Sequence, residues 1–198
     1  PFKDYEVDYE ALGRMVDYVI NGGVDYIVAL GSTAETATMS LEERDKVLRF
    51  IVKHTAGRVA IVAGMGSNDT HALVEQLRTF DLSDTVAILS VVPYYNKPSQ
   101  EGIYRHFMAV AEASPVPVII YNVPGRTGLN MTAQTTLRLA RATDKIVAIK
   151  EACGNIEQMQ QILDGRPDNF LVLSGDDGLT VELIKRGGNG VISVAANE

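Results

Sequence analysis

The stretch "VDYIVALGSTAETATMSLEERDKVLRFIVKHTAGRVAIVAGMGS", residues 24–67, contains the unit from which the rest of the chain is built. Short apolar segments stand at its two ends, and a helix-like stretch lies between them. Ser40, with Glu43 three residues later, predicts a capping box at the start of this helix, and Gly57 predicts its end. The stretch therefore predicts two buried strands joined by a crossover helix, as in parallel sheets.

The same apolar pattern occurs seven times, and helix-like stretches lie between its copies. A second such helix, "SQEGIYRHFMAVAEASP", begins after Ser99 and stops before a "PVP" sequence. The seven predicted strands lie within residues 24–32, 59–67, 85–95, 116–124, 145–152, 170–177 and 190–197. Strands that alternate with helices predict a parallel α/β fold. Because no glycine-rich phosphate motif follows any strand, the pattern favours a TIM (β/α)8 barrel over a doubly wound sheet.

The number of strands is one short of a closed barrel. Such a barrel needs eight strands and typically about 250 residues, whereas this chain has 198 residues and seven predicted strands. It begins with a helical pattern after "PFKD" and ends at the tip of a strand. No linker rich in proline or serine divides it. We therefore expect one partial barrel domain over residues 1–198, lacking the first strand and the last helix.

Composition excludes several classes of function. The net charge is −7, and no basic stripe occurs, which argues against a nucleic-acid partner. Cys153 is the single cysteine, so a reducing compartment such as the cytoplasm is expected. No apolar run reaches about 18 residues, so no membrane span is predicted. Histidine, cysteine and carboxylate residues lack metal-ligand spacing, and we expect neither a metal nor another cofactor.

Polar residues at the predicted strand ends are the candidates for catalysis, because barrel enzymes carry their active sites there. Lys150 directly follows the apolar run 146–149. One interpretation is a structural lysine that extends out to solvent or pairs with a carboxylate. The other is a lysine that forms a Schiff base with a carbonyl substrate. Burial favours Schiff-base formation because it lowers the pKa of an amine toward neutrality. Glu151 should point to the opposite face of the strand.

Tyr121 ends the strand that precedes the strand of Lys150. Neighbouring parallel strands lie about 4.8 Å apart, so the two strand ends can meet. Tyr121 is either an aromatic residue of the core or a phenol that transfers protons during imine chemistry. Its hydroxyl would then need partners, and Ser32, Thr33 and Tyr95 are available.

Two further motifs carry groups suited to carboxylates. Ser32 and Thr33 in "GSTAET" either cap a helix or bind a carboxylate through their hydroxyl and amide groups. Arg126 in "NVPGRTG" is either a surface residue or binds a second carboxylate with two hydrogen bonds.

Tyr94 and Tyr95 lie in a loop next to proline, where exposed tyrosines are often interface residues.

The motifs "GSTAET", "PYYNKPSQEG", "YNVPGRTG", "IKEACGN", "LSGDD" and "GGNGVISV", in this order and spacing, resemble the class I aldolases of the dihydrodipicolinate synthase and N-acetylneuraminate lyase family. The resemblance covers essentially all 198 residues. Family members have a first strand and a C-terminal helical region that this chain lacks. They are commonly homotetramers, built as dimers of dimers, and use small-molecule substrates. Ala34 stands where the family usually has glycine, and alanine would be strained there if the position needs a positive φ.

The resemblance implies a role for each candidate residue. Lys150 would form the imine with pyruvate, and Tyr121 would transfer protons. Ser32 would link Tyr121 to Tyr95 of a neighbouring subunit. The residues implied to bind substrate are Thr33 for the pyruvate carboxylate, Arg126 for the carboxylate of the second substrate, and Gly175 and Ile192 as lining of the pocket.

Arg126 favours the synthase branch of the family. The implied reaction is the condensation of pyruvate with L-aspartate 4-semialdehyde to 4-hydroxy-tetrahydrodipicolinate, in lysine and diaminopimelate biosynthesis. Two alternatives remain open. One is another pyruvate-dependent aldolase of the same family, an N-acetylneuraminate lyase or a keto-deoxy sugar acid aldolase. The other is an inactive fragment.

Overall fold

A computed structural model describes residues 1–198 and contains one parallel sheet of seven strands. The strands are β3 (Tyr26–Ala29), β4 (Ala60–Gly64), β5 (Ala87–Val91), β6 (Val118–Asn122), β7 (Ile146–Glu151), β8 (Leu171–Ser174) and β9 (Gly190–Val191). Each strand pairs with the next along the chain. All seven predicted strands are confirmed, and their order is that of consecutive units around a (β/α)8 barrel.

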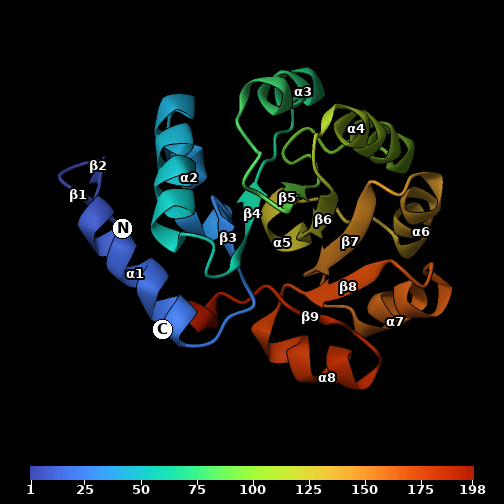
Figure 1. The fold of residues 1–198 in the computed structure, drawn as a ribbon. Helices are drawn as coiled ribbons and strands as arrows, with labels where there is room; N and C mark the ends of the chain where they lie inside the picture. The colour runs from blue at the N-terminus through green and yellow to red at the C-terminus, as the bar shows by residue number, and fades with distance from the viewer.

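Helices surround the curled sheet (Figure 1). They are α1 (Tyr9–Asn21), α2 (Leu41–Thr55), α3 (Thr70–Thr79), α4 (Gln100–Ala113), α5 (Pro124–Thr127), α6 (Ala133–Ala142), α7 (Ile156–Gly165) and α8 (Thr180–Lys185). None of them is both long and apolar enough to cross a membrane. The sheet is thus covered on its outside by helices and carries the candidate residues at the ends of its strands.

The predicted helix boundaries are confirmed in three of four cases. The Ser40 hydroxyl accepts a hydrogen bond from the Glu43 amide (3.2 Å), and the Glu43 carboxylate accepts one from the Ser40 amide (2.8 Å), which is the predicted capping box. α4 begins after Ser99 and ends before the prolines, as expected. The end of α2 was predicted one residue too late, because Ala56 already adopts the left-handed conformation that was expected at Gly57.

The sheet has two buried faces, which explains why its strands are almost continuously apolar. The outer face packs against the helices in a cluster of 32 buried residues. The inner face encloses a smaller cluster of nine: Val62, Ala87, Leu89, Ile119, Tyr121, Val123, Ala148, Leu173 and Ile192. Side chains alternate between the two faces along each strand. The inner cluster leads directly to the candidate residues.

Several short elements were not predicted. An antiparallel hairpin pairs β1 (Phe2–Lys3) with β2 (Glu6–Val7). Single 3₁₀ turns follow three of the strands: η1 (Ser32–Ala34) and η2 (Thr36–Thr38) after β3, η3 (Asp177–Leu179) after β8, and η4 (Ala195–Asn197) after β9. These segments are too short to show a hydrophobic period. They form much of the surface around the carboxyl ends of the strands.

Candidate active site

Lys150 lies on β7 with its side chain inside the curled sheet. In the two parallel ladders it is opposite Tyr121 of β6 and Leu173 of β8. It shares the inner face with Ala148, two residues earlier, as strand alternation requires. Only 7% of its surface is exposed, and none of the salt bridges includes it. The lysine neither extends into solvent nor pairs with a carboxylate.

The surroundings of Lys150 favour its neutral form. Burial lowers the pKa of Lys150 from 10.5 to about 8, the negative charge of Asp177 acts in the opposite direction, and Arg126 lowers it further. The amine nitrogen lies 4.3 Å from the centre of the Tyr121 ring. With a pKa of about 8, about one amine in ten is neutral at pH 7. Lys150 can therefore act as a nucleophile.

Gly175, which follows β8, gives the Lys150 side chain its room. A Cβ atom at this position would lie 2.9 Å from Cε and 3.0 Å from Cγ of Lys150. It would also lie 2.9 Å from the Cβ atom of Ala152. Any other residue at position 175 would thus displace the amine. Gly175 therefore lies beside the Lys150 side chain, next to the pocket that it was predicted to line.

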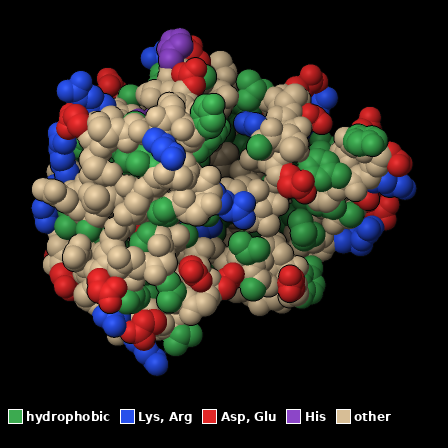
Figure 2. Space-filling model, turned by 180° about the vertical axis from the view of Figure 1, so that it is seen from behind, with side chains coloured by type: hydrophobic (Ala, Val, Ile, Leu, Met, Phe, Trp, Pro, Cys, Tyr) green, Lys and Arg blue, Asp and Glu red, His purple; other side chains and the backbone are tan.

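A pocket of about 330 Å³ opens beside the lysine. Six of the eight predicted site residues line it: Ser32, Thr33, Tyr121, Arg126, Lys150 and Ile192. A second pocket of about 280 Å³ shares Ser32, Tyr121 and Arg126 with the first. Figure 2 shows a hollow on the face seen from behind Figure 1, with a basic side chain beside it. The structure thus gathers most of the candidates around one cavity.

Ser32 and Thr33 lie in the exposed turn η1, where neither hydroxyl forms a hydrogen bond that caps a helix. The chain reaches this turn across the end of β4, where a Cβ atom on Gly64 would lie 2.1 Å from the Leu30 carbonyl oxygen. Only glycine allows that approach. Positive φ angles in this loop occur at Leu30 (60°) and Glu35 (55°), whereas Ala34 is helical and unstrained.

Tyr121 is buried against the lysine, but the predicted chain of hydroxyl groups is not formed in this structure. Burial raises the pKa of Tyr121, and the charge of Arg126 opposes this effect. The Tyr121 hydroxyl has no hydrogen bond to Ser32, although both residues line the pocket. Tyr95 lies outside both pockets, with its side chain 87% exposed. Its backbone φ of 69° is positive.

Arg126 lies in the short helix α5 at the mouth of both pockets. Its side chain is exposed and forms no salt bridge. The amide of Arg126 donates to the Val123 carbonyl (2.9 Å), which holds the loop to the end of β6. The guanidinium group is therefore free to bind an anion.

Asp177 begins the turn η3 after β8, and the sequence predicted no role for it. Its carboxylate accepts hydrogen bonds from the amides of Val194 and Ala195, at 3.2 Å each. The Ser193 hydroxyl and these amides lower the pKa of Asp177. Because it acts on the pKa of Lys150, Asp177 belongs to the site. No group of three or more histidine, cysteine or acidic side chains is arranged to hold a metal ion.

Comparisons with known proteins show the family to which this chain is similar. A sequence model of the dihydrodipicolinate synthetase family matches residues 1–198. The 4-hydroxy-tetrahydrodipicolinate synthase of Phocaeicola vulgatus is 57% identical over 198 residues, which are 100% of this chain and 67% of that protein.

Solved structures also share the fold, and two of them serve as examples. The crystal structure of dihydrodipicolinate synthase from Aquifex aeolicus has a TM-score of 0.95 and 44% identity, and covers 100% of this chain and 67% of its own. The chloride-inhibited dihydrodipicolinate synthase from Acinetobacter baumannii, solved in complex with pyruvate, has a TM-score of 0.94 and 41% identity, with 99% and 67% covered.

The titration of Lys150 tests the electrostatics of the site. Competitive acetylation over the neutral to alkaline range, followed by mass spectrometry of the peptide that contains Lys150, should give a midpoint of about 8. Reactivity should rise with pH through this value, because only the neutral amine is acetylated. A midpoint near 10.5 contradicts the burial effect.

The variant Asp177→Asn serves as a companion test, because it removes the charge that raises the pKa of Lys150. Its midpoint should therefore be lower than that of the unmodified protein. Asp176→Asn is the matched control, since Asp176 is the neighbouring acid but has no effect on the pKa of Lys150.

Proposed function

Because this chain belongs to the dihydrodipicolinate synthetase family, we propose that it condenses pyruvate with L-aspartate 4-semialdehyde to give 4-hydroxy-tetrahydrodipicolinate. The observation that carries the proposal is the buried Lys150 amine, held 4.3 Å from the ring centre of Tyr121 with a pKa of about 8. A neutral amine that lines a pocket can attack a ketone. The product would serve lysine and diaminopimelate biosynthesis.

Each step assigns a task to a residue of this chain. The Lys150 nitrogen attacks the ketone carbon of pyruvate, and loss of water leaves a protonated imine. Removal of a methyl proton gives an enamine, whose carbon attacks the aldehyde carbon of the second substrate. Attack of the amino group of that substrate on the imine carbon then closes the ring and releases Lys150. Tyr121 is the proton carrier for these steps, and no cofactor is required.

Binding groups for two carboxylates support the choice of substrates. Thr33 lies in the exposed turn η1 beside Lys150 and would hold the pyruvate carboxylate. Arg126, at the mouth and without an acidic partner, would hold the carboxylate of the semialdehyde. Gly175 and Ile192 would shape the wall around the imine.

Tyr95 supports an assembly of several subunits, because it projects from the protein on a loop with two residues at positive φ, Tyr95 and Lys97. We place this side chain in the active site of a neighbouring copy, where Ser32 would link it to Tyr121, within a homotetramer built as a dimer of dimers. Residues 1–198 form one domain in this proposal, and the single cysteine favours the cytoplasm.

Reductive trapping tests the reaction. The protein treated with pyruvate and sodium borohydride should carry an N-(1-carboxyethyl) group on Lys150, detected by peptide mass spectrometry, because the reductant converts the imine to a stable secondary amine. Lys150→Arg should remain unmodified and inactive. Absence of the adduct in the unmodified protein excludes the mechanism.

Arg126→Ala tests the choice of the second substrate. Loss of a charge-assisted contact costs about 1.5–3 kcal/mol, so kcat/KM for the semialdehyde should fall about 10- to 150-fold. Formation of the pyruvate imine should change much less. Arg126→Lys should lie between the two, since it keeps the charge and loses the paired donors. Arg138→Ala is the control, because Arg138 pairs with Glu101 on the helical surface. Equal losses in both steps contradict this role.

A mixture of two inactive variants tests the role of Tyr95. Tyr95→Ala and Lys150→Ala each lack one component of the site. Dissociated and reassociated in equal amounts, they should regain activity at about a quarter of all sites, because half of the dimers are mixed and each mixed dimer has one complete site. Each variant carried through the same procedure alone is the control. No regain, or a monomer by sedimentation equilibrium, contradicts the proposed assembly.

A further inference from the structure

Directly behind the reacting pair, on the outer face of the sheet, lies a second pair of polar residues. Asn122 and Glu151 are register partners, one position beyond the register partners Tyr121 and Lys150. Both are completely buried, with 0% exposed, and neither lines a pocket. Since side chains alternate along a strand, this pair faces the helices and cannot touch the substrate.

The Glu151 carboxylate accepts hydrogen bonds from three nitrogen donors and also lies against the Cys153 thiol. One oxygen accepts from the Asn122 side chain and the Cys153 amide, each at 2.9 Å. The other accepts from Asn122 (3.2 Å) and from the Gln158 side chain (3.1 Å). Burial raises the pKa of Glu151, and these hydrogen bonds oppose that effect. No cation pairs with it. Because a buried acid without a cation stabilises a fold poorly, its place calls for another explanation.

Asn122 joins this carboxylate to the loop that carries Arg126. Its side-chain oxygen accepts from the Met131 amide (3.0 Å), and its nitrogen donates to the Asn130 side chain (2.8 Å) as well as to Glu151. The loop between β6 and α6 therefore starts next to Asn122 and returns to it. Arg126 lies between these two attachments.

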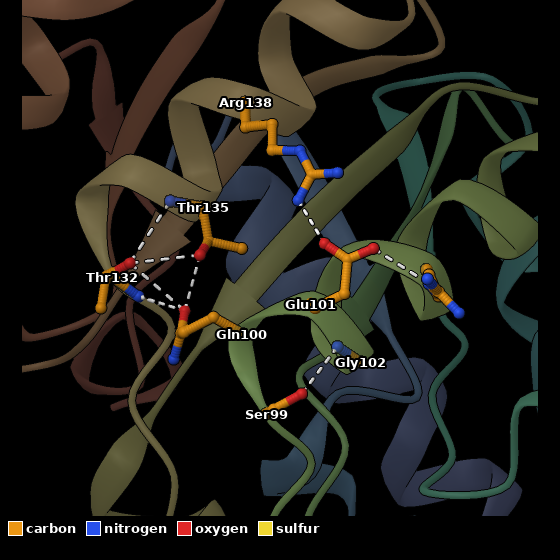
Figure 3. A network of polar contacts seen from close by, with 8 residues as sticks. Ser99, Gln100, Glu101, Gly102, Thr132, Thr135 and Arg138 are labelled. Atoms are coloured by element: carbon orange, nitrogen blue, oxygen red, sulfur yellow. Dashed lines mark hydrogen bonds and ion pairs between the residues drawn. The ribbon is translucent and has the colours of Figure 1, made fainter.

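The far end of the same loop is also fixed by α4. Figure 3 shows the side-chain oxygen of Gln100 accepting hydrogen bonds from Thr132 and Thr135. The Gln100 nitrogen donates to the Asn130 carbonyl (2.8 Å). The Asn130 side-chain nitrogen donates to the Gln158 side-chain oxygen (2.8 Å), and the Gln158 nitrogen donates to the Glu151 carboxylate. The hydrogen bonds thus form a closed network around the end of the loop.

The ladder between β6 and β7 explains why such a pair is needed. Its register shifts between Val118 and Ile119, so one extra residue of β7 lies before Ala148. The ladder that sets Tyr121 opposite Lys150 is therefore short, with four pairs in all from Ile119 to Asn122. A side-chain link immediately after the reacting pair opposes slippage of the two strands.

We propose that Asn122 and Glu151 are positioning residues, which hold Tyr121, Lys150 and the Arg126 loop in their working arrangement without contacting the substrate. This inference rests on the proposed function, since it concerns the geometry of that reaction. A displacement of about 1 Å in a reacting group can cost about a hundredfold in rate.

The variants Asn122→Ser and Glu151→Gln test the proposal. Active sites are first counted by borohydride trapping at saturating pyruvate, so that misfolded protein is excluded from kcat. We expect kcat per trapped site to fall about a hundredfold in each variant, while the KM for pyruvate changes little because Thr33 is untouched. Ser90→Ala is the matched control. Ser90 is equally buried on β5, but its hydroxyl has no hydrogen-bond partner, so kcat should be unchanged.

The exchanged double variant Asn122→Asp/Glu151→Gln gives a second readout. It restores one acid and one amide to the same two positions. Its kcat relative to the unmodified protein should therefore be higher than the product of the relative kcat values of Asn122→Asp and Glu151→Gln measured separately. A purely structural role would lower the urea midpoint and the number of trapped sites but leave kcat per site unchanged.

The outcomes separate two failures. If the unmodified protein forms no imine, the proposed function fails, and the positioning role fails with it. If the unmodified protein turns over but the single variants keep kcat per site within about twofold, or do not fold at all, only the positioning role is overturned.

Discussion

The parallel pairing of β6 with β7 is the constraint on which the candidate site depends. It places Tyr121 opposite Lys150 on the inner face, and Asn122 opposite Glu151 on the outer face. Because side chains alternate with a period of two, a slip of one residue would bring Glu151 into the barrel and send Lys150 among the helices. β5 pairs with the other edge of β6, and β8 pairs with the other edge of β7. A shifted register between β6 and β7 would therefore place polar side chains in a buried part of the sheet.

The buried amine has a cost that the rest of the inner face must offset. A lysine whose pKa falls from 10.5 to about 8 destabilises the fold by about 3 kcal/mol at neutral pH. This cost is fully present below pH 8, where both folded and unfolded chains bind the proton, and it disappears as the pH rises to 10.5. Complete burial of one large apolar side chain contributes about 1.5–3 kcal/mol. Two such residues, for example Leu89 and Ile119 of the inner cluster, offset the amine.

The strands, the two helix starts and the identity of the lysine were predictable because each depends on local pattern. Apolar runs specify buried strands, and Ser40 with Glu43 specifies a cap. The hairpin β1–β2 and the 3₁₀ turns were not predictable, because segments of two or three residues have no period. For the same reason the positive φ of the first loop could not be assigned to Glu35 instead of Ala34. The role of Asp177 depends on the fold of the segment after β8, the neighbour of the Lys150 strand, and on its hydrogen bonds to Val194 and Ala195, which no spacing along the chain reveals.

Lys150 and Glu151 show how one strand gives two adjacent buried ionisable groups different surroundings. Burial acts on both in the direction of the neutral form. On the outer face, however, Glu151 meets four nitrogen contacts, which favour the carboxylate. On the inner face Lys150 lies over an aromatic ring and is also influenced by the opposing charges of Asp177 and Arg126. No hydrogen-bond acceptor stabilises its ammonium form. With a pKa of about 8, about one Lys150 amine in ten is neutral at pH 7. The neutral amine is the form in which a lysine can attack a carbonyl carbon.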